Sequence, residues 1–200
     1  MNTREIERFL EADTVCRRVF QGVFSADTLP NQPRLLVCNT DNFTKPGQHW
    51  IAIHVDADGR GEYFDSFGRA PNKHFESYMN THCTRWTFNR KQLQSIISTF
   101  YGFYCCMFCM LRCRKIDMTR IVNMFTTDTA FNDNLARDSV CNKSFGNFPL
   151  AFIYNTTFSR HIHFIEQRKH SNTSIHSQSS PQSFNWIIVI RLENETVIRI

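Results

Sequence analysis

The sequence lacks a long apolar run and the start that is typical of a secreted protein. Its 200 residues contain no stretch of about 18 apolar residues, the length that a membrane-spanning helix requires. The first residues, MNTREIERFLEAD, are polar and amphipathic, unlike the apolar core of a signal peptide. We therefore expect no membrane segment, a location in the cytoplasm or nucleus, and reduced thiols.

Tandem repeats and the signature of a nucleic-acid-binding fold are also missing. The net charge is +5 with His counted neutral, and the basic residues are scattered. This balance permits weak contact with nucleic acid or an acidic partner, but it is also typical of an ordinary soluble surface. The eight cysteines are too few for a chain of this length to be a disulfide-stabilised mini-protein.

Apolar residues make up 42% of the chain and 19 residues are Phe, so one domain with a hydrophobic core is expected. A helix is predicted over 3–13, with Asn2 and Glu5 in a capping box. Asp58-Gly59 predicts a tight turn between two strands. Strands are predicted at 34–40, 49–56, 61–67 and 84–90, and further helices at 73–82, 101–115, 118–125 and 129–142. This order predicts an α+β fold.

The last part of the chain has a different composition. Clear periodicity ends near residue 145, and the stretch HSNTSIHSQSSPQS (170–183) is polar and of low complexity, so disorder is expected there. NWIIVIRL (185–192) has the composition of a strand without an evident partner. We predict a folded domain over 1–145 and an irregular tail over 146–200.

Three short motifs follow one another in the order that thiol proteolysis requires. They are Gln-His-Trp (48–50) at the start of a strand, Phe-Asp-Ser-Phe-Gly (64–68) at the end of the next, and Leu-Gln-Ser (93–95) before a cysteine-rich helix. In this chemistry a His takes the thiol proton, a carboxylate orients the imidazole, and an amide stabilises the oxyanion. Taken alone, such a His or Asp is more often structural, so the inference depends on their joint order.

The stretches GQHWIAIHV, GEYFDSFGR, LQS and STFYGFYCCMF resemble adenovirus-type (adenain-like) cysteine proteases and their relatives in Maverick/Polinton transposons. These families share the papain-like fold of SUMO and ubiquitin-like-protein proteases. The resemblance covers about residues 3–142 and implies a small mixed sheet around a central buried helix. It also implies that His49 is the base, that Asp65 orients it, that Gln94 lines the oxyanion hole, and that the partner is a protein or peptide substrate. No cofactor is predicted, although a peptide or DNA activator stays open.

The chain departs from this family at the nucleophile. The family's Cys-Gly, seven residues after the Gln, is Tyr101-Gly102 in this sequence. A bulky phenol with an ordinary pKa of about 10 cannot replace a thiol. Cys105 lies on the same helix face but about 6 Å deeper, at a rise of about 1.5 Å per residue. We therefore predict that Cys105, Cys106 and Cys109 are core residues.

Zinc binding is an alternative role for Cys105, Cys106, Cys109 and Cys113. All four lie on one predicted helix, however, whereas a tetrahedral site usually takes ligands from two elements. Three functions stay open: a protease scaffold inactivated at Tyr101, a pseudoenzyme that binds a peptide or ubiquitin-like tail without cutting it, and an active protease. The third requires a neighbouring cysteine as nucleophile or an error in the sequence at residue 101.

Overall fold

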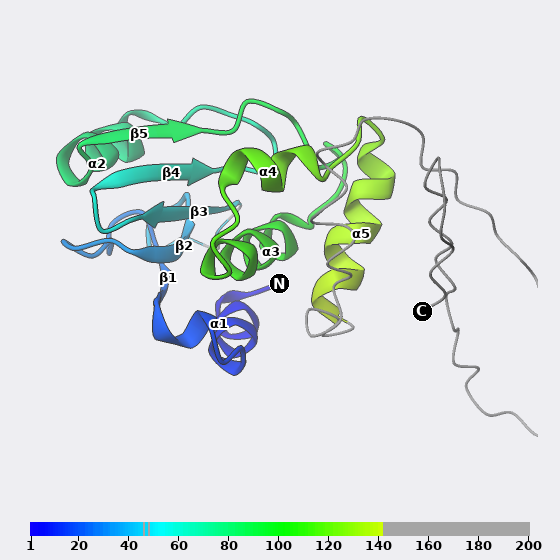
Figure 1. Ribbon diagram of the computed structural model, residues 1–200, viewed down its shortest axis with the longest axis horizontal. Coiled ribbons are helices and arrows are strands. Elements are labelled where there is room, and N and C mark those ends of the chain that lie inside the picture. Colours follow the sequence, from blue (N-terminus) through cyan, green and yellow to red (C-terminus); the bar gives the residue numbers. More distant parts are fainter. Residues whose placement is uncertain (46, 48, 142–200) are drawn as a thin grey trace, which may run out of the picture. The chain divides into compact units, whose positions relative to one another are not determined.

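The computed structural model describes residues 1–45, 47 and 49–141 (Figure 1). The predicted tail over 146–200, with its low-complexity stretch 170–183 and the strand-like run 185–192, lies outside the described residues.

Five strands form one mixed sheet in the order β1-β2-β3-β4-β5. Strands β2, β3 and β4 pair antiparallel, whereas β1 and β5 lie parallel to their neighbours at the two edges. Their bounds are β1 (Phe20–Phe24), β2 (Leu35–Asn39), β3 (Trp50–Val55), β4 (Arg60–Phe64) and β5 (Arg85–Phe88). Together with the helices, this sheet confirms the predicted α+β fold.

The helices begin and end within two residues of the predicted positions. They are α1 (Thr3–Ala12), α2 (Lys73–His82), α3 (Tyr101–Cys113), α4 (Met118–Asn123) and α5 (Thr129–Cys141), with a short 3-10 turn η1 (Cys16–Arg18) after α1. The predicted capping box starts α1, since Asn2 Oδ1 accepts from the Glu5 amide and the Asn2 amide donates to the Glu5 carboxylate.

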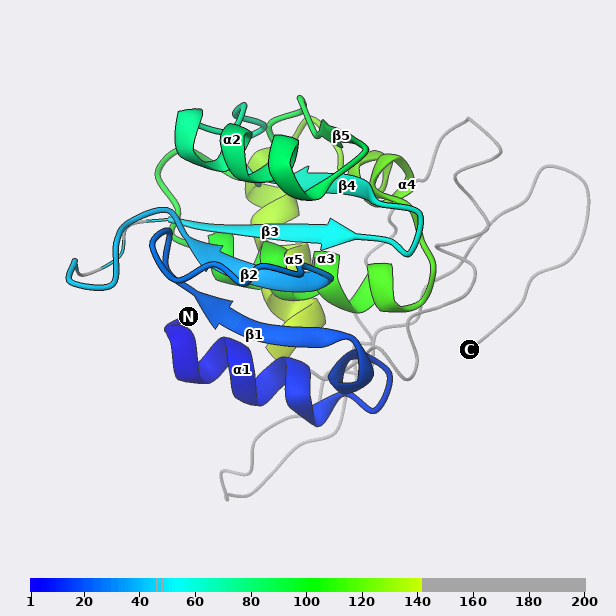
Figure 2. The same ribbon diagram turned by 90° about the vertical axis from the view of Figure 1, so that its left-hand side faces the viewer.

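Side chains alternate between the two faces of the sheet, so each face has its own core. Trp50 and Ala52 of β3 pack with α1, α3, α4 and α5, whereas Ile51 and Ile53 pack with α2 on the other face. Figure 2 shows α2 in front of the sheet and α3 and α5 behind it. This two-sided burial is why β3 is apolar at nearly every position.

Helix α3 is the central helix of the larger core. Nine of its 13 residues are buried, and the Phe108 ring stacks on Phe64 of β4 with centroids 4.6 Å apart. A helix enclosed on most sides must be apolar on most sides. This is why the run YGFYCCMFCMLRC has no polar face.

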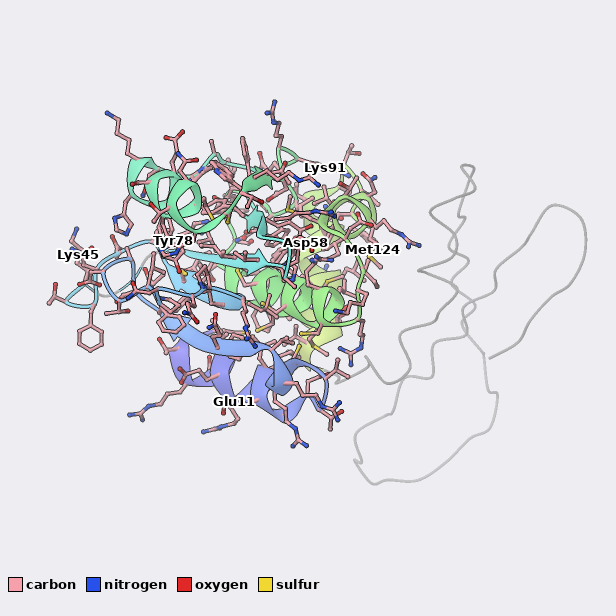
Figure 3. All side chains as sticks on the ribbon, turned by 60° about the vertical axis from the view of Figure 1, so that its left-hand side comes forward. Glu11, Lys45, Asp58, Tyr78, Lys91 and Met124 are labelled. Atoms are coloured by element: carbon pink, nitrogen blue, oxygen red, sulfur yellow. The ribbon has the colours of Figure 1, made fainter. Side chains whose placement is uncertain are left out.

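The hairpin of β3 and β4 determines where the candidate site lies. Gly59 adopts φ +74° in the turn, and Asp56 Oδ1 accepts from the Asp58 and Arg60 amides. Figure 3 shows Asp58 at this turn and Lys45 on the loop before β3, at opposite ends of the strand. The residue before β3 and the residue after β4 therefore meet at the open end.

Strand β1 was not predicted, because the stretch 19–30 was assigned no element. Its pairing with β2 shifts register between Phe20 and Val23, and Gly22 has φ +130°. Such an irregularity interrupts the alternation of side chains by which a strand is predicted from sequence.

Candidate active site

His49 and Asp65 form a hydrogen-bonded pair at the open end of the hairpin. His49 Nε2 lies 2.9 Å from Asp65 Oδ1, and the two side chains are 14% and 4% exposed. An ionised carboxylate only accepts, so Nε2 carries the hydrogen and Nδ1 is the basic atom of the neutral ring. Nδ1 is buried and has no hydrogen-bond partner among the described residues. The ring therefore keeps a nitrogen with which it can take a proton.

The turn formed by Phe-Asp-Ser-Phe-Gly holds the Asp65 carboxylate in place. Asp65 Oδ1 also accepts from the Phe67 amide at 2.8 Å, and the Gly68 amide donates to the Asp65 carbonyl at 2.8 Å. Gly68 has φ +68°, and a Cβ there would lie 2.7 Å from the Lys91 carbonyl carbon. Only glycine fits this position.

Asn89, which follows β5, fixes the backbone of Asp65 from the other side. The Asp65 amide donates to Asn89 Oδ1 at 2.9 Å, and Asn89 Nδ2 donates to the Asp65 carbonyl at 2.7 Å. Asn89 is buried. It was not singled out in the sequence, because a lone Asn after a strand gives no signal until its partner is known.

Tyr101, the first residue of α3, lies against His49. The two ring centroids are 5.4 Å apart and the planes are nearly perpendicular, at 82°. The Phe67 ring also contacts the imidazole, with centroids 5.1 Å apart. The N-cap residue, Phe100, gives the helix no side-chain hydrogen bond. The start of α3 therefore combines the helix dipole with amide groups that no side-chain cap satisfies, an arrangement that favours an anion.

Gln94 is fully buried, and its side chain is largely occupied. The Ser66 hydroxyl donates to Gln94 Oε1 at 2.6 Å, and Gln94 Nε2 donates to the Ser98 carbonyl at 2.9 Å. One of its two amide hydrogens remains. In the described part of the chain, Gln94 makes no direct hydrogen bond to His49 or Asp65. It is linked to the pair through Ser66, the neighbour of Asp65.

Two buried residues of α5 hold the segment that contains Gln94. Asn132 Nδ2 donates to the Leu93 carbonyl at 3.0 Å, and Asp133 Oδ1 accepts from the Ser95 amide at 3.4 Å. Asp133 Oδ1 also accepts from the Tyr104 hydroxyl at 2.9 Å. Burial, assisted by Asp133, raises the pKa of Tyr104, so this phenol stays protonated. Neither Asn132 nor Asp133 was singled out in the sequence, because polar residues on a helix do not reveal their partners.

The cysteines that follow Tyr101 lie in the core. Cys105, Cys106 and Cys109 are fully buried free thiols, as predicted. Burial raises the pKa of all three, so they are neutral at pH 7. Within residues 1–45, 47 and 49–141, no group of three or more His, Cys, Asp or Glu side chains is placed to hold a metal ion.

Two loops that lead into the site carry exposed apolar side chains. Phe43, on the loop before His49, is 79% exposed. Ile96 and Ile97, between Gln94 and α3, are 75% and 90% exposed. Among the described residues these are the three most exposed large apolar side chains. None of the helices in the described ranges has the length and hydropathy to span a bilayer.

A scan against protein-family models found no match, and a search of curated proteins found none either. Among solved structures, the chain is similar to the ASFV pS273R protease, with a TM-score of 0.50 and 19% identity over 68% of this chain. The match spans 66% of that protease, slightly less than two thirds of its length. The central domain of the Lpg1148 protein from Legionella pneumophila has a TM-score of 0.42 and 9% identity, over 73% of this chain and 96% of that one. The SUMO protease Ulp1 has a TM-score of 0.38 and 12% identity, over 72% of this chain and 78% of that one. The chain therefore shares the fold of the ASFV pS273R protease.

Proposed function

We propose that the chain is a thiol-protease scaffold of the adenovirus or Maverick/Polinton type that has lost peptide hydrolysis together with its nucleophile. The observation that supports this most strongly is the contact between Tyr101 and His49, beside an intact His49–Asp65 pair. A base and its orienting carboxylate are present, and a phenol stands at the helix start. The narrower kinship with viral and transposon enzymes rests on the sequence motifs.

The lost reaction follows from the proposed roles of the remaining residues. With a thiol at residue 101, His49 Nδ1 would take its proton, and Asp65 would hold the resulting imidazolium through Nε2. The amides at the start of α3 and the remaining amide hydrogen of Gln94 would face the oxyanion. Tyr101 cannot enter this cycle, because its oxygen lies at the far end of a rigid ring, whereas the sulfur of Cys is bonded directly to Cβ.

A neighbouring cysteine does not offer a substitute. Cys105 is one turn deeper in α3 and fully buried. Burial raises the pKa of its thiol, so it would not supply a thiolate at neutral pH. This argues against the alternative of an active protease that uses another thiol.

Peptide hydrolysis tests the proposal directly. We expect no hydrolysis of a quenched fluorescent peptide library by the unmodified protein above the rate of a His49→Ala variant. Turnover by the unmodified protein that His49→Ala abolishes would overturn the proposal.

A second candidate function is peptide binding without cleavage, and the exposure of Phe43, Ile96 and Ile97 favours it. Their loops flank the proposed site, so an extended polypeptide with apolar side chains is the ligand that this surface fits. A ubiquitin-like tail is one such segment. We also propose a location in the cytoplasm or nucleus. No observation on the described residues favours nucleic-acid contact.

A further inference from the structure

An open cavity lies between helix α2 and the loop that follows β1. Leu29 and Tyr78 (labelled in Figure 3) pack against the core on the α2 face of the sheet, whereas Tyr101 packs against the other core. The cavity volume is about 210 Å³, below the roughly 300–1,000 Å³ of a site for a drug-sized ligand, so it suits one side chain of a partner. The residues that line it are Ala26, Asp27, Leu29 and Asn31 of the loop and His74, Tyr78 and His82 of α2.

The cavity is preformed, because two side chains of α2 fasten the loop to the helix. His74 Nε2 donates to the Ala26 carbonyl at 2.6 Å, and the Tyr78 hydroxyl donates to the Pro30 carbonyl at 2.5 Å. Burial raises the pKa of Tyr78, so this phenol keeps its hydrogen at neutral pH. A site whose walls are already in place loses less free energy to ordering when a ligand binds.

These two bonds use hydrogen-bond donors of the lining and leave acceptors. A carbonyl oxygen only accepts, so His74 Nε2 carries the hydrogen and Nδ1 of the neutral ring is an acceptor. The Tyr78 hydroxyl hydrogen is likewise taken by the Pro30 carbonyl. Asp27 adds a carboxylate, which only accepts when it is ionised. The ligand that fits such a lining is therefore rich in N–H groups.

Asp27 carries the only formal charge in the lining when His is counted neutral. Asp27 Oδ1 accepts from the Phe43 amide at 2.9 Å, and hydrogen bonds from Ser25 and from this amide lower the pKa of the carboxyl group. The group is therefore ionised at neutral pH. It is exposed, and in the part of the chain that the structure describes it takes part in no salt bridge. This negative charge is thus open to a cation from a partner.

The rings of Tyr78 and His82 form an aromatic wall of the same cavity. Their centroids are 4.5 Å apart and their planes are inclined at 54°. A planar guanidinium stacks on aromatic rings and binds a carboxylate through two N–H groups at once, whereas the ammonium group of lysine acts as a point charge. Arginine also offers five N–H donors. It is therefore the side chain that matches both the aromatic wall and the acceptors.

The cavity also adjoins an exposed apolar side chain. Phe43, whose amide donates to Asp27, is 79% exposed, so a polypeptide that covers Phe43 passes close to the cavity. We infer that the cavity holds an arginine side chain of a partner polypeptide, stacked on the rings of Tyr78 and His82 and paired with Asp27. Binding in this cavity requires neither hydrolysis nor any residue of the candidate active site.

Nuclear magnetic resonance titration of the isotope-labelled, unmodified protein tests the ligand. The probe is a capped peptide of glycines with one central arginine, and its matched control carries citrulline, which has the shape of arginine without the charge. We expect saturable shifts at residues 26–31 and in α2 with the arginine peptide, and a Kd about fivefold higher for the citrulline peptide. Equal Kd values for the two peptides, or no saturable shift at these residues, would overturn the inference.

The variant Asp27→Asn tests the residue. Asn keeps an oxygen that can accept from the Phe43 amide, so the loop is retained while the negative charge is lost. We expect the Kd of the arginine peptide to rise about fivefold, and the preference over citrulline to disappear. Asp58→Asn, the matched control, removes an exposed carboxylate that pairs with Arg60 at the β3–β4 turn, and it should leave this Kd unchanged. A preference for arginine that survives in Asp27→Asn would contradict the inference.

Discussion

His49 Nε2 donates to Asp65 Oδ1 over 2.9 Å, although the two residues are 16 positions apart in the chain. The hairpin of β3 and β4 brings the two residues together, because His49 directly precedes β3 and Asp65 directly follows β4. Asp65 is in turn fixed by Asn89, Phe67 and the Gly68 turn. The pair is thus held by several hydrogen bonds, and each of these supports can be tested separately.

Replacing Asn89 with Ala removes both hydrogen bonds to the backbone of Asp65. Each of the two buried backbone groups left unsatisfied costs about 1–3 kcal/mol, so we expect the free energy of unfolding to fall by about 2–6 kcal/mol. Urea unfolding measures this change. Asn80→Ala is the matched control, since Asn80 accepts one exposed hydrogen bond from Trp86, and it should cost less than about 1 kcal/mol. Equal losses in the two variants would show that Asn89 does not support the site.

Gly68→Ala tests the turn that carries Asp65. An alanine at positive φ costs about 1–2 kcal/mol, and this Cβ would also meet the Lys91 backbone at 2.7 Å. Gly59→Ala is the control, because Gly59 also has positive φ but its Cβ would meet the Thr84 side chain at 3.1 Å. In thermal unfolding, Gly68→Ala should lower the midpoint clearly more than Gly59→Ala. Similar unfolding midpoints for Gly68→Ala and Gly59→Ala would show that the Lys91 backbone does not exclude a side chain at residue 68.

Alkaline pH should destabilise the fold through its buried thiols. Burial raises the pKa of Cys38, Cys83, Cys105, Cys106 and Cys109. In the unfolded chain these thiols lose their protons above about pH 8.5, whereas the folded protein retains them, so the unfolded state binds fewer protons. Stability is therefore complete below about pH 8.5 and falls above it, by up to about 1.4 kcal/mol per pH unit for each thiol. Urea unfolding between about pH 7 and 9.5 measures the slope.

The slope has a direct control in the variant Cys109→Ala. This change lowers the free energy of unfolding at pH 7 because it leaves a small cavity. It should also make the fall of that free energy with rising pH less steep, because one buried thiol no longer contributes to it. A decline that is identical in Cys109→Ala would mean that other groups cause it.

Peptide binding should depend on the exposed apolar side chains of the two loops. If an extended apolar peptide binds across the site, Phe43→Ser or Ile97→Ser should each raise its Kd about tenfold, since burial of one such side chain contributes about 1.5–3 kcal/mol. Fluorescence anisotropy with a labelled peptide measures Kd. Val19→Ser, an exposed apolar side chain after η1, is the control and should leave Kd unchanged. Binding that survives both loop variants would place the ligand elsewhere.

The sequence allowed most of the fold to be predicted where local signals were strong. Asp58-Gly59 predicted the turn, and the apolar run after Tyr101 predicted a buried helix. The bulged edge strand β1 was missed because its register shift interrupts the alternation.

That His49, Asp65 and Tyr101 lie together could be expected from the sequence, but most contacts around them could not. His49 and Asp65 were expected to meet because a hairpin joins them. The partner of Gln94 was not foreseen, because Ser66 lies 28 positions away and the bond depends on how the loop folds onto the turn. Asn89 and Asp133 act through packing between distant segments, which no local pattern indicates.

Labelling with an electrophilic peptide probe for thiol proteases is the decisive test of a scaffold disabled at residue 101. The unmodified protein and the Tyr101→Cys variant are labelled side by side at neutral pH. The same two proteins carrying the additional substitution His49→Ala are labelled in parallel. The labelled cysteine is then mapped by mass spectrometry. We predict that only Tyr101→Cys is labelled in a His49-dependent way, at residue 101. His49-dependent labelling of Cys105, Cys106 or Cys109 in the unmodified protein would contradict this prediction, and so would a thiol at residue 101 that reacts equally fast with and without His49.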